Sequence, residues 1–412
     1  MPAIDPLELI DPVSYGRHGL PHAQWTQLRR ESPVEYFEAP GWPSFWAITK
    51  HADIVEVSKQ PEVFLNGPGM TIAREEILAS EGETTPPLRT IINMDPPDHR
   101  KFRQVASPYF TPRAMRQLQP LVEKTARDLV DELGPEGECD FIGRVASIHP
   151  LKIIARILGV PESDEPFILK LTNELFGSED PEFQRGEDRL ESMRSLFMEF
   201  WTYFGQIMQD RRRQPTGDLA SVIANAEIDG KPMGELETMG YCLITFTAGH
   251  ETTRGSIGGG LDALLDAPDQ LARWGREPEI TPKAIDEIVR FVTPVNHMMR
   301  TASRDYELRG RKIREGDRLV LFYASANRDE EIFEAPDALR LDRNPNRHLG
   351  FGIGEHFCLG ANLARMTSGT LFRELTARIE HVERIGDAER AASNLVPGLK
   401  HLPIRYRLRP AS

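Results

Sequence analysis

The chain has 412 residues, 40% of them hydrophobic, which is enough for a large core that can enclose a cofactor. Its net charge of −13 argues against broad nucleic-acid binding, because that activity needs a basic face to neutralise phosphates. The N-terminus shows no basic segment followed by an apolar one, and nowhere do about 18 consecutive apolar residues occur. We therefore expect a cytoplasmic protein without a membrane-spanning helix.

The first half of the chain begins with a predicted β-hairpin and continues into helices. Residues 33–49 have the composition of two short strands, with Pro40-Gly41 in the turn between them. Residues 65–97, rich in Gly, Pro and Thr, are expected to form a long loop. From about 113 to 225 the apolar spacing predicts helices, including a long amphipathic one over 190–211.

The second half carries the longest predicted helix, over 235–267, which includes a glycine-rich segment. The elements expected after it are a helix from Pro282 to Phe291, strands at 304–308 and 318–323, an irregular stretch over 327–357, and a helix over about 360–379. No repeat or linker interrupts the chain, so we predict one domain over 1–412 that is mainly α with a minor β part. The β-rich part is expected near 33–60 and 295–325, and the helical part over 93–290 and 360–380.

A glycine-rich segment precedes one of the three cysteines. Gly350, Gly352 and Gly354 suit a tight loop whose backbone approaches something flat or bulky. Cys358 then comes just before the helix expected near Gly360, where free N–H groups and the helix dipole favour a thiolate. A thiolate is a good ligand for a soft metal. The alternative is a buried, inert cysteine beside a turn.

Three further segments carry polar residues whose spacing has an ordinary structural interpretation. In Ala248-Gly249-His250-Glu251-Thr252-Thr253 the threonine hydroxyls compete for backbone carbonyls, so a local distortion or kink of the helix is expected. Glu287 and Arg290 are spaced as a surface ion pair. His99 and Arg103 face one way if a helix starts after the preceding prolines.

Taken together, these segments resemble the cytochrome P450 family in chain order over roughly residues 93–365. The most specific match is the haem-binding signature, Phe351-Gly352-x-Gly354-x-His356-x-Cys358-x-Gly360. The resemblance implies a single triangular P450-type fold that encloses haem b. It implies that Cys358 gives its thiolate to the haem iron, that Phe351 shelters the sulfur, and that His356 lies near a haem propionate. An axial thiolate favours O–O cleavage.

The same resemblance assigns roles on the distal side of the haem. It implies that Ala248 and Gly249 lie over the distal haem face, that Thr252 hydrogen-bonds iron-bound dioxygen, and that Glu251 relays protons inward. Controlled delivery of two protons separates productive O–O cleavage from the release of peroxide.

The remaining motifs are assigned to haem binding and to bracing. His99, Arg103 and Arg300 match family residues that contact the propionates, a pairing of cations with carboxylates. Glu287 and Arg290 would form a buried pair that braces the cysteine loop together with Arg343. The family often carries an aromatic residue in the segment before this arginine where this chain has Ala338-Leu339, so the third partner is less well marked than the other two.

Electrons are expected from separate proteins, because the chain ends about fifty residues beyond Cys358 and leaves no room for a fused reductase domain. The resemblance implies a small acidic iron–sulfur ferredoxin with an NAD(P)H-dependent reductase. A basic patch would steer such a partner; its members would be Arg100, Lys101, Arg103, Arg113, Arg116, Arg347 and Arg365. The alternative is a set of solvated arginines without a partner.

The segments that line the family's substrate pocket are apolar here. They supply Ile72, Ile91, Leu171, Phe176, Leu243, Val295, Met298 and Val396. Such a pocket suits a hydrophobic small molecule of terpenoid, steroid, alicyclic or aromatic class. Asn296 and His297 either add polar anchoring or face away.

The favoured interpretation is an O₂-dependent monooxygenase. A peroxygenase or rearrangement enzyme of the same fold, and a non-enzymatic haem sensor, are the alternatives. Both have less need of the Glu251-Thr252 pair, whose presence therefore counts against them.

Overall fold

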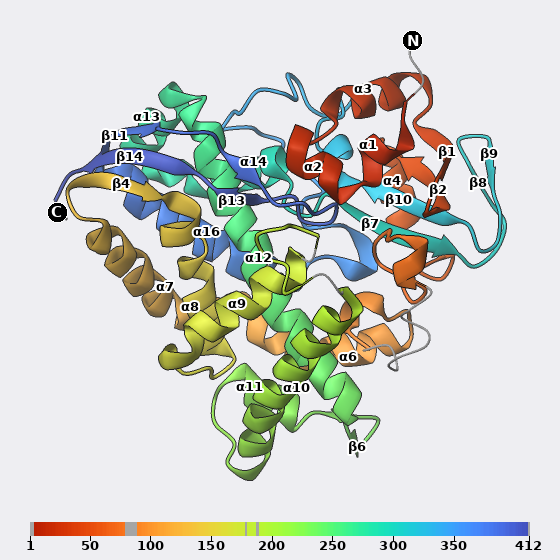
Figure 1. Cartoon of the computed structure of the whole chain (residues 1–412), viewed down its shortest axis with the longest axis horizontal. Helices are drawn as coiled ribbons and strands as arrows, with labels where there is room; N and C mark the ends of the chain where they lie inside the picture. Colours follow the sequence, from red (N-terminus) through yellow and green to blue (C-terminus); the bar gives the residue numbers. More distant parts are fainter. Residues whose placement is uncertain (1–3, 79–88, 178, 187–188, 411–412) are drawn as a thin grey trace.

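The computed structural model describes residues 4–78, 89–177, 179–186 and 189–410. Helices dominate one side of the molecule, and the sheets gather at its margins (Figure 1). The helices in the first part of the chain are α1 (Pro6–Ile10), α2 (Pro12–His18), α3 (His22–Glu31), α4 (His51–Ser58), α6 (Asp98–Ala106), α7 (Pro112–Leu133), α8 (Ile148–Ile157), α9 (Glu165–Phe176), α10 (Arg189–Arg213) and α11 (Leu219–Ala224). Those that follow are α12 (Glu235–Leu265), α13 (Pro268–Arg276), α14 (Thr281–Val292), α15 (Tyr323–Ala326) and α16 (Ala361–Arg378).

The strands form two larger sheets and three two-stranded pieces. The five-stranded sheet has the order β1-β2-β10-β7-β3 and consists of β1 (Val34–Ala39), β2 (Trp42–Ile48), β3 (Phe64–Leu65), β7 (His297–Ala302) and β10 (Arg318–Phe322). The three-stranded sheet joins β4 (Glu136–Asp140) to β11 (Ile379–Arg384) and β14 (Pro403–Leu408). The short pairs are β5 (Glu227–Ile228) with β6 (Lys231–Pro232), β8 (Tyr306–Leu308) with β9 (Arg311–Ile313), and β12 (Glu389–Arg390) with β13 (Leu399–His401).

The long helix α12 crosses the molecule and packs on several neighbours (Figure 1). Its glycine-rich segment allows this, because a Cβ at Gly260 would lie 2.9 Å from both Ile288 of α14 and Phe372 of α16. A Cβ at Gly249 would meet Ile154 of α8 at the same distance. Small residues therefore let α12 approach its neighbours closely at the centre of the core.

Several predicted elements are confirmed, and the fold is mainly helical as expected. The hairpin over 33–49 forms as β1 and β2, with Gly41 at φ 77° in its turn. The helices predicted over 235–267, 282–291 and 360–379 appear as α12, α14 and α16 within two residues at each end. Among the described residues, no helix is both long and apolar enough to cross a membrane.

Other predictions are wrong or incomplete. The helical run over 113–225 is interrupted by β4, which exists because it pairs with β14 near the C-terminus. The strands β11 and β14 lack a local signal strong enough to be predicted, whereas β7 lies in the β-rich part expected near 295–325. The threonine hydroxyls of 248–253 bond to carbonyls four residues earlier, as predicted, while α12 is assigned as helix throughout. The central part of the predicted 65–97 loop, residues 79–88, lies outside the described residues.

Candidate functional site

The cysteine loop is a tightly bonded turn at the N-terminus of α16. The backbone N–H of Cys358 donates to the carbonyl of Phe351 over 2.9 Å, which closes the loop. Gly352 and Gly354 have φ values of 68° and 79°, a left-handed conformation that favours glycine. A Cβ at Gly354 would collide with the carbonyl of Ser58 in α4. The close approach made by Gly354 is therefore to the protein's own backbone.

Gly360 behaves differently from the other glycines of this loop. A Cβ at Gly360 would find no atom within 4 Å among the described residues, so there is open space beside Cys358. On α12, an otherwise largely buried helix, Ala248 is exposed and both Gly249 and Thr252 are partly exposed. These positions form an accessible stripe without charge, against which a flat apolar ring system can pack.

The electrostatics of Cys358 combine opposing effects. Burial raises the pKa of the Cys358 thiol, whereas the Gly360 N–H and the positive charges of Arg103 and Arg365 lower it. The start of α16 thus acts in the predicted direction, but burial outweighs it. A bound metal ion would favour the thiolate further, because a coordinating thiol is deprotonated by the metal's charge.

Phe351 and Phe357 flank the cysteine on the chain. The Arg365 guanidinium lies 4.4 Å from the centre of the Phe351 ring, and Nε of Arg365 donates to Asp286 over 2.7 Å. The Phe351 ring is therefore held in place from α16 and α14. Phe357 is 41% exposed, which puts an aromatic side chain on the surface directly beside Cys358.

Glu287, Arg290 and Arg343 meet in the core behind the cysteine loop. Glu287 and Arg290 are fully buried, so they are not a surface pair. Arg343 Nε lies 2.9 Å from Glu287 Oε2, and Arg290 Nη2 lies 2.7 Å from Oε1. The two arginines also donate to backbone carbonyls at Asn327, Pro336, Glu334, Ala335 and Ala338. Arg343 thus joins the pair even though Ala338-Leu339 lacks the aromatic residue.

Four basic side chains converge beside the loop. The rings of His99 and His356 are 4.1 Å apart, and Arg103 Nη2 donates to the Phe357 carbonyl over 2.6 Å. Burial, and then the charges of His99, Arg300 and Arg103, lower the pKa of His356 to about 2. His356 Nε2 is buried with no hydrogen-bond partner within the described part of the chain.

These basic groups are short of negative charge. In the described ranges no carboxylate lies within ion-pair distance of Arg103 or Arg300, although Arg300 is only 4% exposed. Glu355 accepts from His99 Nδ1 at 3.1 Å and from Arg100. Of the four basic side chains it therefore pairs with His99 alone among the described residues. The cluster is electrostatically suited to a ligand with two carboxylates.

On α12, the acid of the 248–253 motif has a partner that sequence reasoning missed. Glu251 is 1% exposed, and its Oε1 accepts from Arg254 Nη2 one turn along the helix. Arg254 Nη1 in turn donates to Asn173 Oδ1 of α9 over 2.8 Å. The i,i+3 spacing of Glu251 and Arg254 was a usable signal, the same one that marked Glu287 and Arg290. Thr252 Oγ1 donates to the Ala248 carbonyl over 2.8 Å.

Comparison with known proteins decides the family. The sequence model described as Cytochrome P450 matches residues 180–381. A protein named Cytochrome P450-terp from Pseudomonas sp is 36% identical over 411 residues, which covers 97% of this chain and 96% of that protein. The chain belongs to the cytochrome P450 family.

Further relatives agree with this assignment. Linalool 8-monooxygenase from Pseudomonas putida is 34% identical and covers 93% of this P450 and 95% of its own length. The crystal structure of CYP108D1 from Novosphingobium aromaticivorans superimposes with a TM-score of 0.89 at 36% identity, covering 99% of both chains. The protein is therefore an enzyme of the P450 monooxygenase class, whose members carry a cysteine-ligated haem iron.

The residues present fit such a haem. The basic cluster with the unpartnered His356 nitrogen suits its two propionates, the open space at Gly360 and the uncharged stripe on α12 suit its ring, and Cys358 suits its iron. The buried Glu287 network lies behind the loop that carries the cysteine.

The predicted substrate-pocket residues are only partly brought together in this P450. Leu243 of α12 lines a small apolar cavity between α9, α10 and α12, with Leu171, Leu175, Leu196, Phe200 and Thr247. Ile72 and Val396 are buried, with 2% exposure each, and Ile72 packs in the core beside β7. Val295 and Met298 pack against another core cluster, Ile91 packs against the helical core, and Phe176 ends α9. Asn296 and His297 face the core, where they bond to Tyr15 and Thr71.

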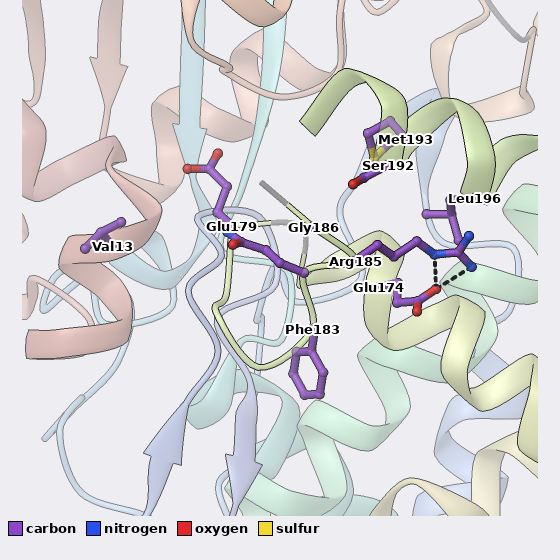
Figure 2. Close-up of a pocket in the computed structure, with 10 residues that line it drawn as sticks. Val13, Glu174, Glu179, Phe183, Arg185, Gly186, Ser192, Met193 and Leu196 are labelled. Carbon is purple, nitrogen blue, oxygen red and sulfur yellow. Dashed lines mark hydrogen bonds and ion pairs between the residues drawn. The ribbon is translucent and has the colours of Figure 1, made fainter. Parts of the chain in front are cut away.

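A larger cavity of about 300 Å³ lies outside the apolar one (Figure 2). Figure 2 shows Val13 of α2 facing the segment after α9, and Arg185 reaching Glu174. Met193 and Leu196 of α10 line both cavities. The smaller cavity is apolar, whereas the larger one, called the outer cavity below, has charged walls at Glu174 and Arg185.

Proposed function

We propose that this P450 inserts one oxygen atom from O₂ into a terpenoid- or steroid-like hydrophobic molecule, using electrons from a separate ferredoxin and its reductase. The observation that carries the proposal is the apolar cavity bounded by α9, α10 and α12. It reaches Leu243 and Thr247, and Thr247 directly precedes Ala248 of the accessible stripe. An apolar substrate in this cavity would thus lie next to the distal residues.

The proximal residues have distinct tasks in this proposal. Cys358 ligates the iron, and His99, Arg103, Arg300 and His356 bind the propionates. Gly360 leaves room for the ring, and Phe351 packs beside the cysteine loop. Once bound, the haem thiolate supplies the activation of O₂ and the cleavage of its O–O bond. Glu287, Arg290 and Arg343 hold the polypeptide behind the loop in one conformation.

The distal residues manage protons. Thr252 presents a hydroxyl that donates to the Ala248 carbonyl and can turn to another acceptor, since a hydroxyl rotates. Glu251 is a buried acid with one oxygen unpaired in the described structure, so it can take up and release a proton there. Ala248, with its small side chain, keeps the space over the haem face free of bulky groups, and Gly249 lets α12 pack against Ile154 of α8.

The walls of this cavity are apolar, which favours a terpenoid class of substrate, and a relative named for linalool supports this class. Terpenoids, steroids and alicyclic or aromatic hydrocarbons all bury apolar surface and need few polar contacts. The charged outer cavity would exclude none of them, because Arg185 is already paired with Glu174 and Glu199.

The electron donor is proposed from surface charge. Arg113, Arg116 and Arg347 are exposed and have no ion-pair partner among the residues the structure describes. By contrast, Arg100, Lys101 and Arg365 are already paired with Glu355, Asp229 and Asp286. The unpaired arginines, together with the exposed Phe357 ring, suit an acidic iron–sulfur ferredoxin.

The first experiment is the carbon monoxide spectrum of the dithionite-reduced protein. We expect a strongly red-shifted Soret band, which Cys358→Ala should abolish; an unchanged band in the variant would refute the ligand assignment. The second experiment measures substrate-dependent NAD(P)H consumption with a ferredoxin and its reductase, over a panel of terpenoids and steroids. Turnover of none of them would refute the substrate class.

The donor assignment is tested separately by stopped-flow reduction. Arg113→Glu and Arg347→Glu should slow reduction by an acidic ferredoxin and flatten its dependence on salt. Arg314→Glu, an exposed arginine in the β-rich part, is the matched control. Equal rates in all three variants would refute a basic docking surface.

A further inference from the structure

Arg254 is bound on two sides, once within α12 and once across to α9. Its side chain is 4% exposed and donates to Glu251 through Nη2 and to Asn173 through Nη1. Its Nε is buried without a hydrogen-bond partner in the described part of the chain. Asn173 Oδ1, at 2.8 Å, is thus the side-chain contact from outside α12 that fixes where the guanidinium lies.

Arg254 is also the charge that acts on Glu251. Burial raises the pKa of Glu251, while the charge and hydrogen bond of Arg254 lower it. The neighbouring His250 is fully buried and bonded to the Ser147 carbonyl, and burial and Arg254 lower its pKa to about 3, so it is neutral. Asn173 adds no charge. The position of Arg254 therefore decides how far the rise that burial causes in the pKa of Glu251 is offset.

The last two turns of α9 also form walls of both cavities. Leu171 and Leu175 line the apolar cavity, and Glu174 lines the outer one, where it holds Arg185 (Figure 2). Asn173 lies between these residues on the same helix. A molecule that occupies either cavity contacts the segment that carries Asn173.

We propose that Asn173 is a positioning residue for Glu251: it holds Arg254 against the acid, so that the placement of α9 by substrate sets the proton affinity of Glu251. This inference rests on the proposed role of Glu251 in proton delivery and deepens it. With α9 in the arrangement described, Arg254 stays on Glu251 and favours its ionised form. When α9 shifts, Arg254 loses its second acceptor, and Glu251 gains affinity for a proton.

The test measures the protonation of Glu251 directly. In the purified haem-containing protein without substrate, the infrared carbonyl band of protonated Glu251 is followed against pH and identified by its loss in Glu251→Gln. Asn173→Leu removes the acceptor at similar size and should move the midpoint of this titration upward by about one pH unit, the scale of a single nearby charge. Asn173→Gln keeps an amide oxygen as an acceptor for Arg254 without adding a charge, and should leave the midpoint unchanged. Lys170→Met, on the exposed face of α9, is the matched control.

A midpoint in Asn173→Leu equal to or below that of the parent protein would overturn the proposal. If the leucine variant does not fold, Asn173→Ser removes the amide oxygen with less added apolar surface, and the same midpoint is measured. In the Glu251→Gln background, Asn173→Leu should have no further effect on the share of NAD(P)H electrons that reach product. If Glu251→Gln itself leaves this share unchanged, the proton role of Glu251 fails, whereas the infrared midpoint still decides the role of Asn173.

Discussion

Glu287 and Glu251 are both buried glutamates with an arginine three residues later on the same helix, yet their surroundings differ. Both oxygens of Glu287 are saturated; their donors are Arg290, Arg343, Asn346 and the backbone N–H of Arg340. Glu251 has one oxygen on Arg254, and the other is buried without a partner among the described residues.

The difference separates a carboxylate that is bonded from several segments from one that is bonded only from its own helix among the described residues. The fully bonded Glu287 ties α14 to the segment that carries Arg340, Arg343 and Asn346. A half-bonded carboxylate is poorly compensated for its burial, which raises the pKa of Glu251. Spacing in the sequence is the same in the two pairs. The contacts from other elements distinguish them.

The largest expected effect is the loss of stability on replacing Glu287. Glu287→Gln leaves Arg290 and Arg343 buried without a counter-charge, and we expect the free energy of unfolding to fall by about 3–5 kcal/mol. Urea unfolding followed by circular dichroism measures it. Glu334→Gln, in the exposed Arg340–Glu334 pair, is the control and should cost at most about 1 kcal/mol. Equal losses in the two variants would contradict a bracing role for Glu287.

Glu251→Gln should lower the free energy of unfolding by about 1–3 kcal/mol. This loss is smaller than that of Glu287→Gln because the substitution disturbs fewer hydrogen bonds. The same urea titration gives the comparison directly. A loss as large as that of Glu287→Gln would mean that Glu251 is chiefly a structural residue.

The pH dependence of stability sharpens this contrast. The pKa of Glu251 is raised above its ordinary 4.5, so the folded protein binds this proton more tightly than the unfolded chain. Its contribution to the free energy of unfolding therefore decreases as pH rises from about 4.5 through the folded-state pKa. Glu251→Gln should remove that decrease, as seen in unfolding measured at several pH values. An identical pH profile in parent and variant would show that Glu251 does not titrate abnormally.

The smallest change in stability is expected for Thr252→Ala. Within the described ranges its hydroxyl bonds only to a carbonyl of the same helix, so the free energy of unfolding should change by less than about 1 kcal/mol. Product formed per NAD(P)H consumed should nevertheless fall by about tenfold or more, with the balance released as peroxide. Peroxide and product assays measure the split. Intact coupling would show that Thr252 is not the hydroxyl that handles the proton.

Much of this protein could be predicted from its sequence because the signals are local. The period of apolar residues is enough for α12, α14 and α16, and Gly41 in a two-residue turn is enough for the β1–β2 hairpin. The family resemblance lies in short motifs such as residues 350–360. Within each motif the relevant neighbours are a few residues apart, so spacing carries the information.

Tertiary structure alone decided the rest. β4 is a strand because β14, more than two hundred residues later, pairs with it. Arg343 reaches Glu287, and Asn173 reaches Arg254, only because separate elements fold together. The low pKa of His356 likewise comes first from its burial and then from charges on other segments. Burial and long-range contacts, which no local spacing encodes, turned one i,i+3 glutamate–arginine pair into a saturated ion network and left the other half-bonded.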